Sequence, residues 1–107
     1  MPGAQTTAAT PGVNRLRLQA RIVEMAPLRY TPAGLPALDV QLEHESTQDE
    51  AGMPRQVHAL VRAVALAAVA ERLVHQHIGS ELGFTGFVAS PRRGRQLVFH
   101  IQDFQQI

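Results

Sequence analysis

Apolar and polar residues alternate along most of the chain. In the first such segment every second residue is apolar: Leu16, Leu18, Ala20 and Ile22. The residues between them are arginine or glutamine. A period of two is typical of a β-strand with one face in the core and the other in water. We therefore predict a first strand that begins near residue 13.

Four later segments carry the same alternation and predict four more strands, over residues 35–47, 55–65, 80–89 and 97–104. Proline and glycine mark the connections between them, at residues 27–34, 49–54 and 90–95. Residues 66–77 differ, because their apolar positions recur at helical spacing and the segment is rich in alanine. This pattern predicts one short helix, with Gly79 placed to end it.

The predicted fold class is all-β. Five strands with one short helix between the third and fourth is the order of the OB-fold, a five-stranded Greek-key barrel. Other short β-barrels share much of this alternation, so the pattern alone leaves them open. Residues 1–12 hold no charge and consist mostly of alanine, threonine, proline and glycine, which predicts a disordered tail. Residues 13–107 are then expected to form one OB-fold domain.

Size and composition agree with one small domain. The chain has 107 residues, of which 45% are apolar, enough for a single core. Cysteine is absent, which excludes disulfides and cysteine-based zinc sites. The start lacks the basic and apolar regions of a secretory signal, and no apolar run approaches the roughly 20 residues of a membrane span. We expect a soluble, cytoplasmic protein without a membrane partner.

Charge is unevenly distributed along the chain. The net charge is +1, but residues 39–50 carry five acids and no arginine, whereas the flanking segments are basic. All ten cations are arginine, whose planar fork suits phosphate and stacks on bases. A genome that favours arginine codons would produce the same bias. The arginines are therefore a modest indication of a nucleic-acid partner.

Residues 90–95 form the predicted loop between the fourth and fifth strands. Arg92, Arg93 and Arg95 lie within this glycine-containing loop. OB-folds bind oligonucleotides on the face of strands two and three, with help from this loop and the loop between strands one and two. An isolated run of this kind is usually a solvated turn. Its position in this fold favours a role in binding nucleic acid.

The residue types of a catalytic or metal site do not converge. His75 and His77 are two apart, so a helix directs them to different faces. Alternation places Glu43 and Glu45 on one strand face and His44 on the other, which argues against a cation site there. Phosphate-binding and nucleophile-elbow motifs are absent. We expect no enzyme, no metal and no cofactor.

Several short strings of the chain are typical of one protein family. The most specific is L-E-H-x-S-x-Q-x-E-A-G at residues 42–52, and residues 31–36 match the turn motif S/T-P-x-G-[LI]-P. Shorter matches are Asn14-Arg15-Leu16, Pro27-Leu28-Arg29, Arg55-Gln56, Gly79-Ser80, Gly86-Phe87 and Leu97-Val98-Phe99-His100. From residue 14 onward the chain resembles the primosomal replication protein N (PriB) family, which is related to bacterial single-stranded DNA-binding proteins.

The resemblance implies a non-catalytic OB-fold homodimer that binds single-stranded DNA. It also implies a role in the replication-restart primosome, with a PriA-type helicase and other primosome proteins as partners. His58 stands where better-known members have a base-stacking Trp, Met53 replaces an aromatic residue, and Glu45 replaces an arginine. Stacking contributes about 1–3 kcal/mol per base, so affinity is expected to be weaker or shifted toward the basic loop.

Individual positions also carry over. Arg29 keeps a basic residue of the first loop, Arg55 matches a basic position before the third strand, and the loop arginines stand where the family has lysines. Tyr30 replaces a basic residue but adds a stacking surface. The predicted nucleic-acid-binding residues are Arg29, Tyr30, Arg55, His58, Arg92, Arg93 and Arg95.

Two other functions fit the sequence. One is a protein adaptor that has lost useful DNA binding, which His58 and the acidic segment favour. The other is an RNA-binding OB module, against which the residue 42–52 string argues. Strong DNA binding would exclude the adaptor, and competition between DNA and RNA would decide the second, because the two differ at the 2′-hydroxyl.

Overall fold

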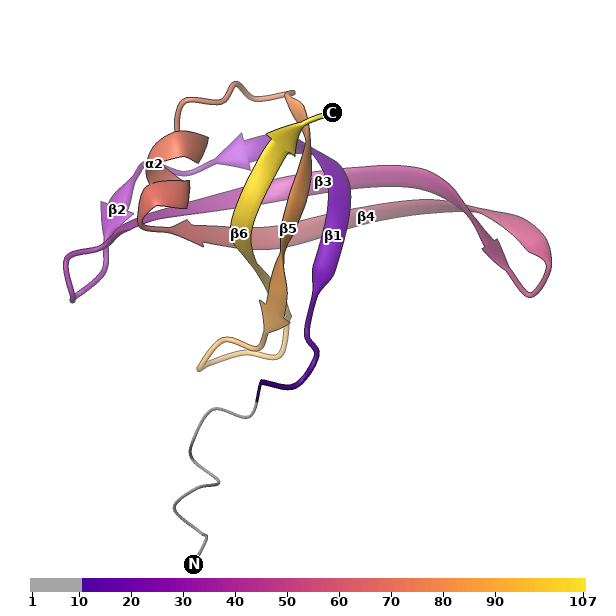
Figure 1. Ribbon diagram of the computed structural model, residues 1–107, viewed down its shortest axis with the longest axis horizontal. Helices are drawn as coiled ribbons and strands as arrows, with labels where there is room; N and C mark the ends of the chain where they lie inside the picture. Colours follow the sequence, from indigo (N-terminus) through magenta and orange to yellow (C-terminus); the bar gives the residue numbers. More distant parts are fainter. Residues whose placement is uncertain (1–10) are drawn as a thin grey trace, which may run out of the picture.

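Five strands of the computed structural model, which describes residues 11–107, close into a barrel with a long ribbon projecting from it (Figure 1). The elements are β1 (Leu16–Met25), β2 (Arg29–Tyr30), β3 (Pro36–Glu50), β4 (Met53–Leu66), α2 (Ala68–Leu73), β5 (Glu81–Ala89) and β6 (Val98–Gln106). The strand order is β1-β5-β6-β4-β3, and the pairing of β1 with β3 closes the barrel. The β4–β6 pairing is parallel. This topology, with α2 between β4 and β5, confirms the predicted OB-fold.

Strand β1 closes the barrel because it changes partner along its length. Its first part, from Leu16 to Arg21, pairs with β5, and its second part, from Arg21 to Met25, pairs with β3. The register shifts between Ile22 and Glu24, which is a β-bulge or a similar irregularity. Bulges bend a strand and increase its twist, so one strand can serve both sides of the barrel.

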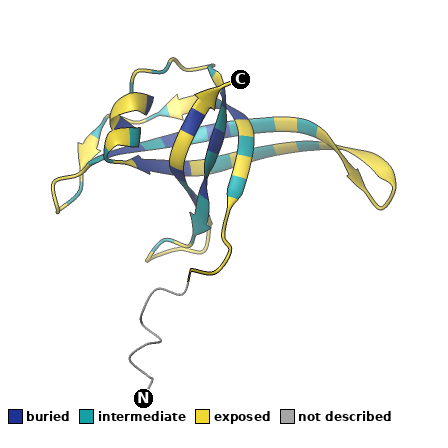
Figure 2. Ribbon diagram, in the orientation of Figure 1, coloured by how far each residue is buried: buried dark blue, intermediate teal, exposed yellow. Residues whose placement is uncertain are grey.

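The core lies inside the barrel and under α2 (Figure 2). Its fully buried large side chains are Phe84, Phe99, Ile22, Leu38, Leu42, Leu73 and Leu82. These come from alternate positions of the strands and from the helix, as the period of two predicts. Among the described residues no polar or charged side chain is buried. The polar chemistry of residues 11–107 therefore lies on the outside.

Strands β3 and β4 form a hairpin that is longer than the barrel needs. They pair without interruption from Ala37 and Leu66 to Glu50 and Met53. Pairing of β3 with β1 stops at Glu43, so the remaining part projects as a two-stranded ribbon (Figure 1). Its turn is narrower than the predicted residues 49–54, because Ala51 and Gly52 alone connect the strands, both with positive φ.

The helix is shorter than the predicted residues 66–77. Leu66 remains in β4, paired with Ala37, and α2 ends at Leu73. The helix buries Ala70 and Leu73. Gly79 takes the left-handed conformation after the turns that follow, and its amide donates a 2.7 Å hydrogen bond to the Ile22 carbonyl. Strand pairing therefore overrode helical spacing at the start of this segment.

The segment predicted as the first loop contains the short strand β2. Arg29 pairs with Ala37 and Tyr30 with Pro36. The turn that follows is held by the Gly34 amide, which donates to the Thr31 carbonyl at 2.8 Å. Two residues are too few to show a period of two, which explains why the pattern did not predict this strand. The pairing fixes both side chains beside β3.

The prediction of a disordered tail concerns residues 1–12, and residues 1–10 lie outside the part of the chain that the structure describes. Pro11 and Gly12 are exposed and have no regular secondary structure. Within residues 11–107, no helix has the length and apolar character needed to span a membrane.

Candidate nucleic-acid interface

One face of the β3–β4 hairpin points outward and carries His58, one of the predicted binding residues. On β4 this face consists of His58, Leu60, Arg62, Val64 and Leu66, of which Val64 is buried. Opposite them on β3 lie Glu45, Glu43, Gln41, Asp39 and the buried Ala37. In OB-folds this is the face that binds oligonucleotides. It is bordered here by β2, by β6 and by the loop at residues 90–97.

Arg92, Arg93 and Arg95 are all exposed on the loop at residues 90–97, the basic loop. Arg92, Arg93 and Arg95 have no carboxylate within 4.0 Å among residues 11–107. Gly94 has a φ of 98°, a conformation that the other residues rarely adopt and that allows the loop to reverse. The three guanidinium groups are therefore available to an anionic ligand.

Arg29 lies on the same face but is already paired. Its Nε donates to Asp39 Oδ2 at 2.6 Å and its Nη2 donates to Asp39 Oδ1 at 3.1 Å, a bidentate ion pair. The hydrogen bond to Asp39 raises the pKa of Arg29. Tyr30, next in the chain, is 66% exposed. A phosphate that approaches Arg29 has to compete with Asp39, whereas the Tyr30 ring is open to a base.

Arg55 lies far from this group, near the end of the ribbon. Its Nη1 donates to Glu50 Oε1 at 2.7 Å across the hairpin turn. Both side chains are about two-thirds exposed, 65% and 64%. Exposed ion pairs of this kind contribute little to stability, so the pairing is easily exchanged for another anion.

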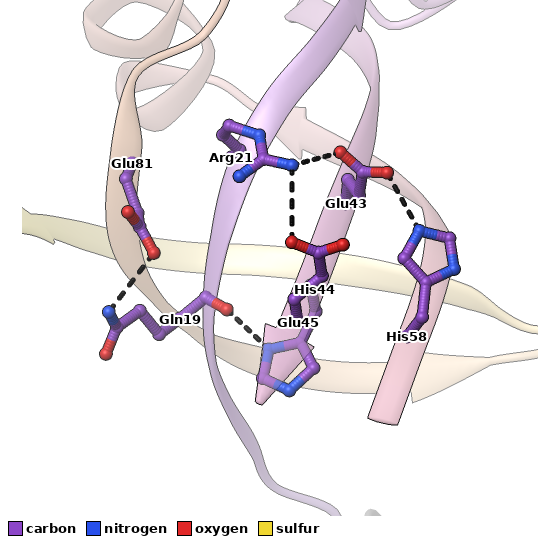
Figure 3. Close-up of polar contacts among 7 residues, drawn as sticks. All are labelled: Gln19, Arg21, Glu43, His44, Glu45, His58 and Glu81. Atoms are coloured by element: carbon purple, nitrogen blue, oxygen red, sulfur yellow. Dashed lines mark hydrogen bonds and ion pairs between the residues drawn. The ribbon is translucent and has the colours of Figure 1, made fainter. Parts of the chain in front are cut away.

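His58 belongs to a polar network on the outward face (Figure 3). Its Nε2 lies 2.8 Å from Glu43 Oε2, and Arg21 of β1 donates to Glu43 and lies 3.8 Å from Glu45. The hydrogen bonds from His58 and then from Arg21 hold the pKa of Glu43 below its usual value. His58 is 53% exposed, so its ring is accessible but held at one edge.

Glu43, Glu45 and His58 lie close enough together to suggest a cation site. The Arg21 guanidinium, however, bonds to Glu43 and lies 3.8 Å from Glu45, so a cationic group already occupies this position. His44 points the other way, with Nδ1 2.6 Å from the Gln19 carbonyl and Nε2 2.7 Å from Ser46 Oγ. The alternation predicted this separation of His44 from its acidic neighbours. We interpret the group as an ion-pair network rather than a metal centre.

Sequence reasoning missed one cation of this face, Arg62. It lies between His58 and Val64 on the outward side of β4, and no carboxylate lies within 4.0 Å of it in residues 11–107. Arg62 and Arg29 both line a cleft of about 260 Å³ that also reaches Pro91, at the base of the basic loop. The alternation that placed His58 outward also places Arg62 outward, so the signal was present.

The predicted residues therefore fall into two groups. Arg29 and Arg62 line one cleft at the barrel end of the face, which the loop that carries the three loop arginines reaches through Pro91. Tyr30 follows Arg29 in β2. Arg55 and His58 lie along the ribbon. Strand order, closure and this outward face define an OB-fold of the class found in single-strand-binding proteins, and comparison with known proteins agrees.

Residues 14–103 match the model of a family described as "another single-strand binding protein family". The replication restart protein PriB of Bordetella pertussis is 43% identical over 96 residues, which cover 89% of this chain and 90% of that protein. The chain belongs to the PriB family of replication restart proteins. The family predicted from the sequence is thereby confirmed.

Solved structures support the same assignment. The structure of PriB from Ralstonia solanacearum superimposes with a TM-score of 0.82 at 36% identity, covering 89% of this chain and 98% of that one. The SSB domain of a Synechococcus protein superimposes with a TM-score of 0.71 at 19% identity, covering 92% of this chain and 100% of that one. The second likeness concerns the fold alone.

Proposed function

We propose that this chain is a non-catalytic, cytoplasmic protein that binds single-stranded DNA during replication restart. One observation carries the proposal: four arginines, one on the outward face of β4 and three on the loop that borders this face, each have no carboxylate partner among residues 11–107. They are Arg62, Arg92, Arg93 and Arg95. Single-strand binding without sequence preference combines such cations with aromatic surfaces, which Tyr30 supplies here.

Equilibrium binding to a labelled oligo-dT strand, compared with a duplex of the same length, tests the proposal. We expect tighter binding to the single strand, because its bases can unstack and reach side chains on the barrel face. Equal or tighter binding to the duplex, or no binding to either, would contradict it.

The proposed partners follow from the family. Relatives over nearly the whole chain are named replication restart proteins, and we infer that a PriA-type helicase and other primosome proteins bind this chain. Co-sedimentation with the helicase of the same bacterium, with and without single-stranded DNA, tests this. Separate sedimentation of the two proteins under both conditions would contradict it.

We further propose a two-fold homodimer. Over Leu16–Ala20, strand β1 pairs with β5 on one side and has no strand on the other among the described residues. An unpaired edge of this kind is a template for a second copy of the same strand. Leu16 and Leu18 of this segment pack only at the margin of the core and remain partly exposed, so a partner would bury them further.

A protein adaptor with weak DNA binding is the second candidate. The observation that favours it is that Arg29, Arg55 and His58 each bond to a carboxylate and are less available to phosphate. Tight single-strand binding by the intact chain would exclude the adaptor. Stronger competition by RNA than by DNA in the same assay would instead identify an RNA-binding module.

A further inference from the structure

The cleft between β2, β4, β6 and the basic loop combines three features that suit one nucleotide. Its volume of about 260 Å³ is slightly below the roughly 300–1,000 Å³ of sites for whole small molecules. It is open to the outward face of the barrel, beside Pro91. A cleft of this size accommodates part of a longer ligand rather than a complete cofactor.

The charges of the cleft favour an anion. Arg29 and Arg62 line it together with one carboxylate, Asp39. Both oxygens of Asp39 accept hydrogen bonds from the Arg29 guanidinium. The charge of Arg62 therefore has no carboxylate partner within 4.0 Å among residues 11–107. Arg62 also borders a neighbouring hollow lined by Glu24 and Gln41, so this residue lines both openings. A backbone phosphate passing between them would contact it.

An aromatic ring forms another wall of the cleft. His100 of β6 lines the cleft and lies opposite Val64 in the sheet. Its ring stacks on Phe87 of β5, with the centroids 4.9 Å apart and the planes 5° apart. Phe87 itself does not line the cleft. Because Phe87 covers one face of the imidazole and fixes its orientation, only the other face and the edges are left for a ligand.

We infer that this cleft binds one nucleotide of the single strand, with Arg62 on the phosphate and the open face of His100 against the base. Phe87, His100 and the base would then form one continuous stack. The subsite rests on the proposed single-strand binding and deepens it. It supplies a stacking position at the barrel end of the face. This position is separate from His58, the position at which the family resemblance implies a stacking Trp.

Four single variants test the subsite: Arg62→Gln, His100→Thr, His100→Phe and the charge-retaining control Arg62→Lys. Lysine keeps the positive charge of the position, so this control separates loss of charge from loss of the arginine side chain. Each variant is titrated with labelled oligo-dT over a range of salt concentrations, and its thermal unfolding is recorded.

Arg62→Gln should lower the slope of log affinity against log salt by about 0.7 per filled cleft. If the variant and the parent bind equally at 1 M salt, the variant should therefore bind roughly fivefold more weakly than the parent at 0.1 M salt. His100→Thr should weaken binding about fivefold or more, whereas His100→Phe should bind like the parent because it keeps the stack. Arg62→Lys should keep the parent slope.

An unchanged slope in Arg62→Gln, or equal affinities of the two His100 variants, would overturn the subsite while the parent still binds DNA. If the parent itself does not bind oligo-dT, both the subsite and the proposed function fail. If His100→Thr does not fold, Arg62→Gln decides alone, because removing a head group that has no ion partner leaves the barrel unchanged.

Discussion

At the scale of single residues, His58 shows how ion pairs shape the outward face. Its imidazole is a smaller ring than a Trp indole, and it is bonded at one edge to Glu43. Arg21 bonds the same carboxylate from β1. This part of the face therefore joins β1, β3 and β4 through charge instead of offering a broad aromatic platform.

Replacing His58 with Trp should tighten single-strand binding by about 1–3 kcal/mol, the contribution of one stacked base. The position is exposed, so the larger ring has room, and the lost bond to Glu43 is a surface interaction of small value. Fluorescence anisotropy with oligo-dT measures the gain, and His58→Ala serves as the control without a ring. Equal affinity of the Trp and Ala variants would show that the strand passes elsewhere.

Glu43 gives the fold a pH dependence whose sign follows from its surroundings. Its pKa is held below the usual 4.5 by His58 and Arg21, so the ionised form is favoured in the folded state. That contribution to stability is complete above the unfolded value and is lost as the pH falls through the depressed folded pKa. Glu43→Gln should therefore lose less stability on acidification than the parent.

Chemical denaturation at neutral pH and below pH 4.5 measures this difference. Glu24→Gln is the matched control, since Glu24 is exposed on β1 and has no cation within 4.0 Å among residues 11–107. Parallel pH profiles of the parent and Glu43→Gln would show that the network has no energetic role.

At the scale of elements, the loop at residues 90–97 and the outward face of β4 share the cationic part of the interface. The loop is exposed and lies outside the core, whereas Arg62 is fixed on a strand. A loop can follow a backbone of variable path, and a strand residue holds one position. Together they suit a ligand that has no unique sequence.

Changing Arg92, Arg93 and Arg95 together to Ala should lower the salt slope by up to about 2 per subunit, at roughly 0.7 per phosphate contacted. The melting temperature should barely change, because none of the three side chains is buried or ion-paired within residues 11–107. A titration series and a thermal melt check both parts. Normal affinity with an unchanged slope would remove the loop from the interface and favour the adaptor.

The sequence predicted the elements whose side chains alternate over many residues. All five barrel strands fall where the period of two placed them. The helix was predicted too long because Leu66 fits both a helical stripe and the end of a strand, and its pairing with Ala37 decides between them. Strand β2 was missed because it has two residues.

The candidate interface was less predictable because its chemistry depends on partners from other strands. Asp39 opposes Val64 in the hairpin and yet binds Arg29 of β2. Glu43 meets Arg21 and His58 only through the β1–β3 and β3–β4 registers. No local pattern reveals which arginine is neutralised across strands, whereas Arg62 could have been found by extending the outward alternation of β4.

At the scale of the whole molecule, we expect a dimer with no folded monomer at working concentration. The chain has a small core, which association would supplement, and the exposed edge of β1 offers a place for it. Sedimentation equilibrium at micromolar concentration should give twice the chain mass of 11.7 kDa. A stable folded species of 11.7 kDa would contradict this expectation.

The central claim is that the barrel face binds single-stranded DNA through its unpartnered arginines, and the salt dependence of oligo-dT binding tests it most directly. If Arg62 and the three loop arginines all contact phosphate, the slope of log affinity against log salt should be about −3 per subunit. Binding should also favour the single strand over duplex at every salt concentration. A slope near zero, or no measurable binding at low salt, would contradict the account.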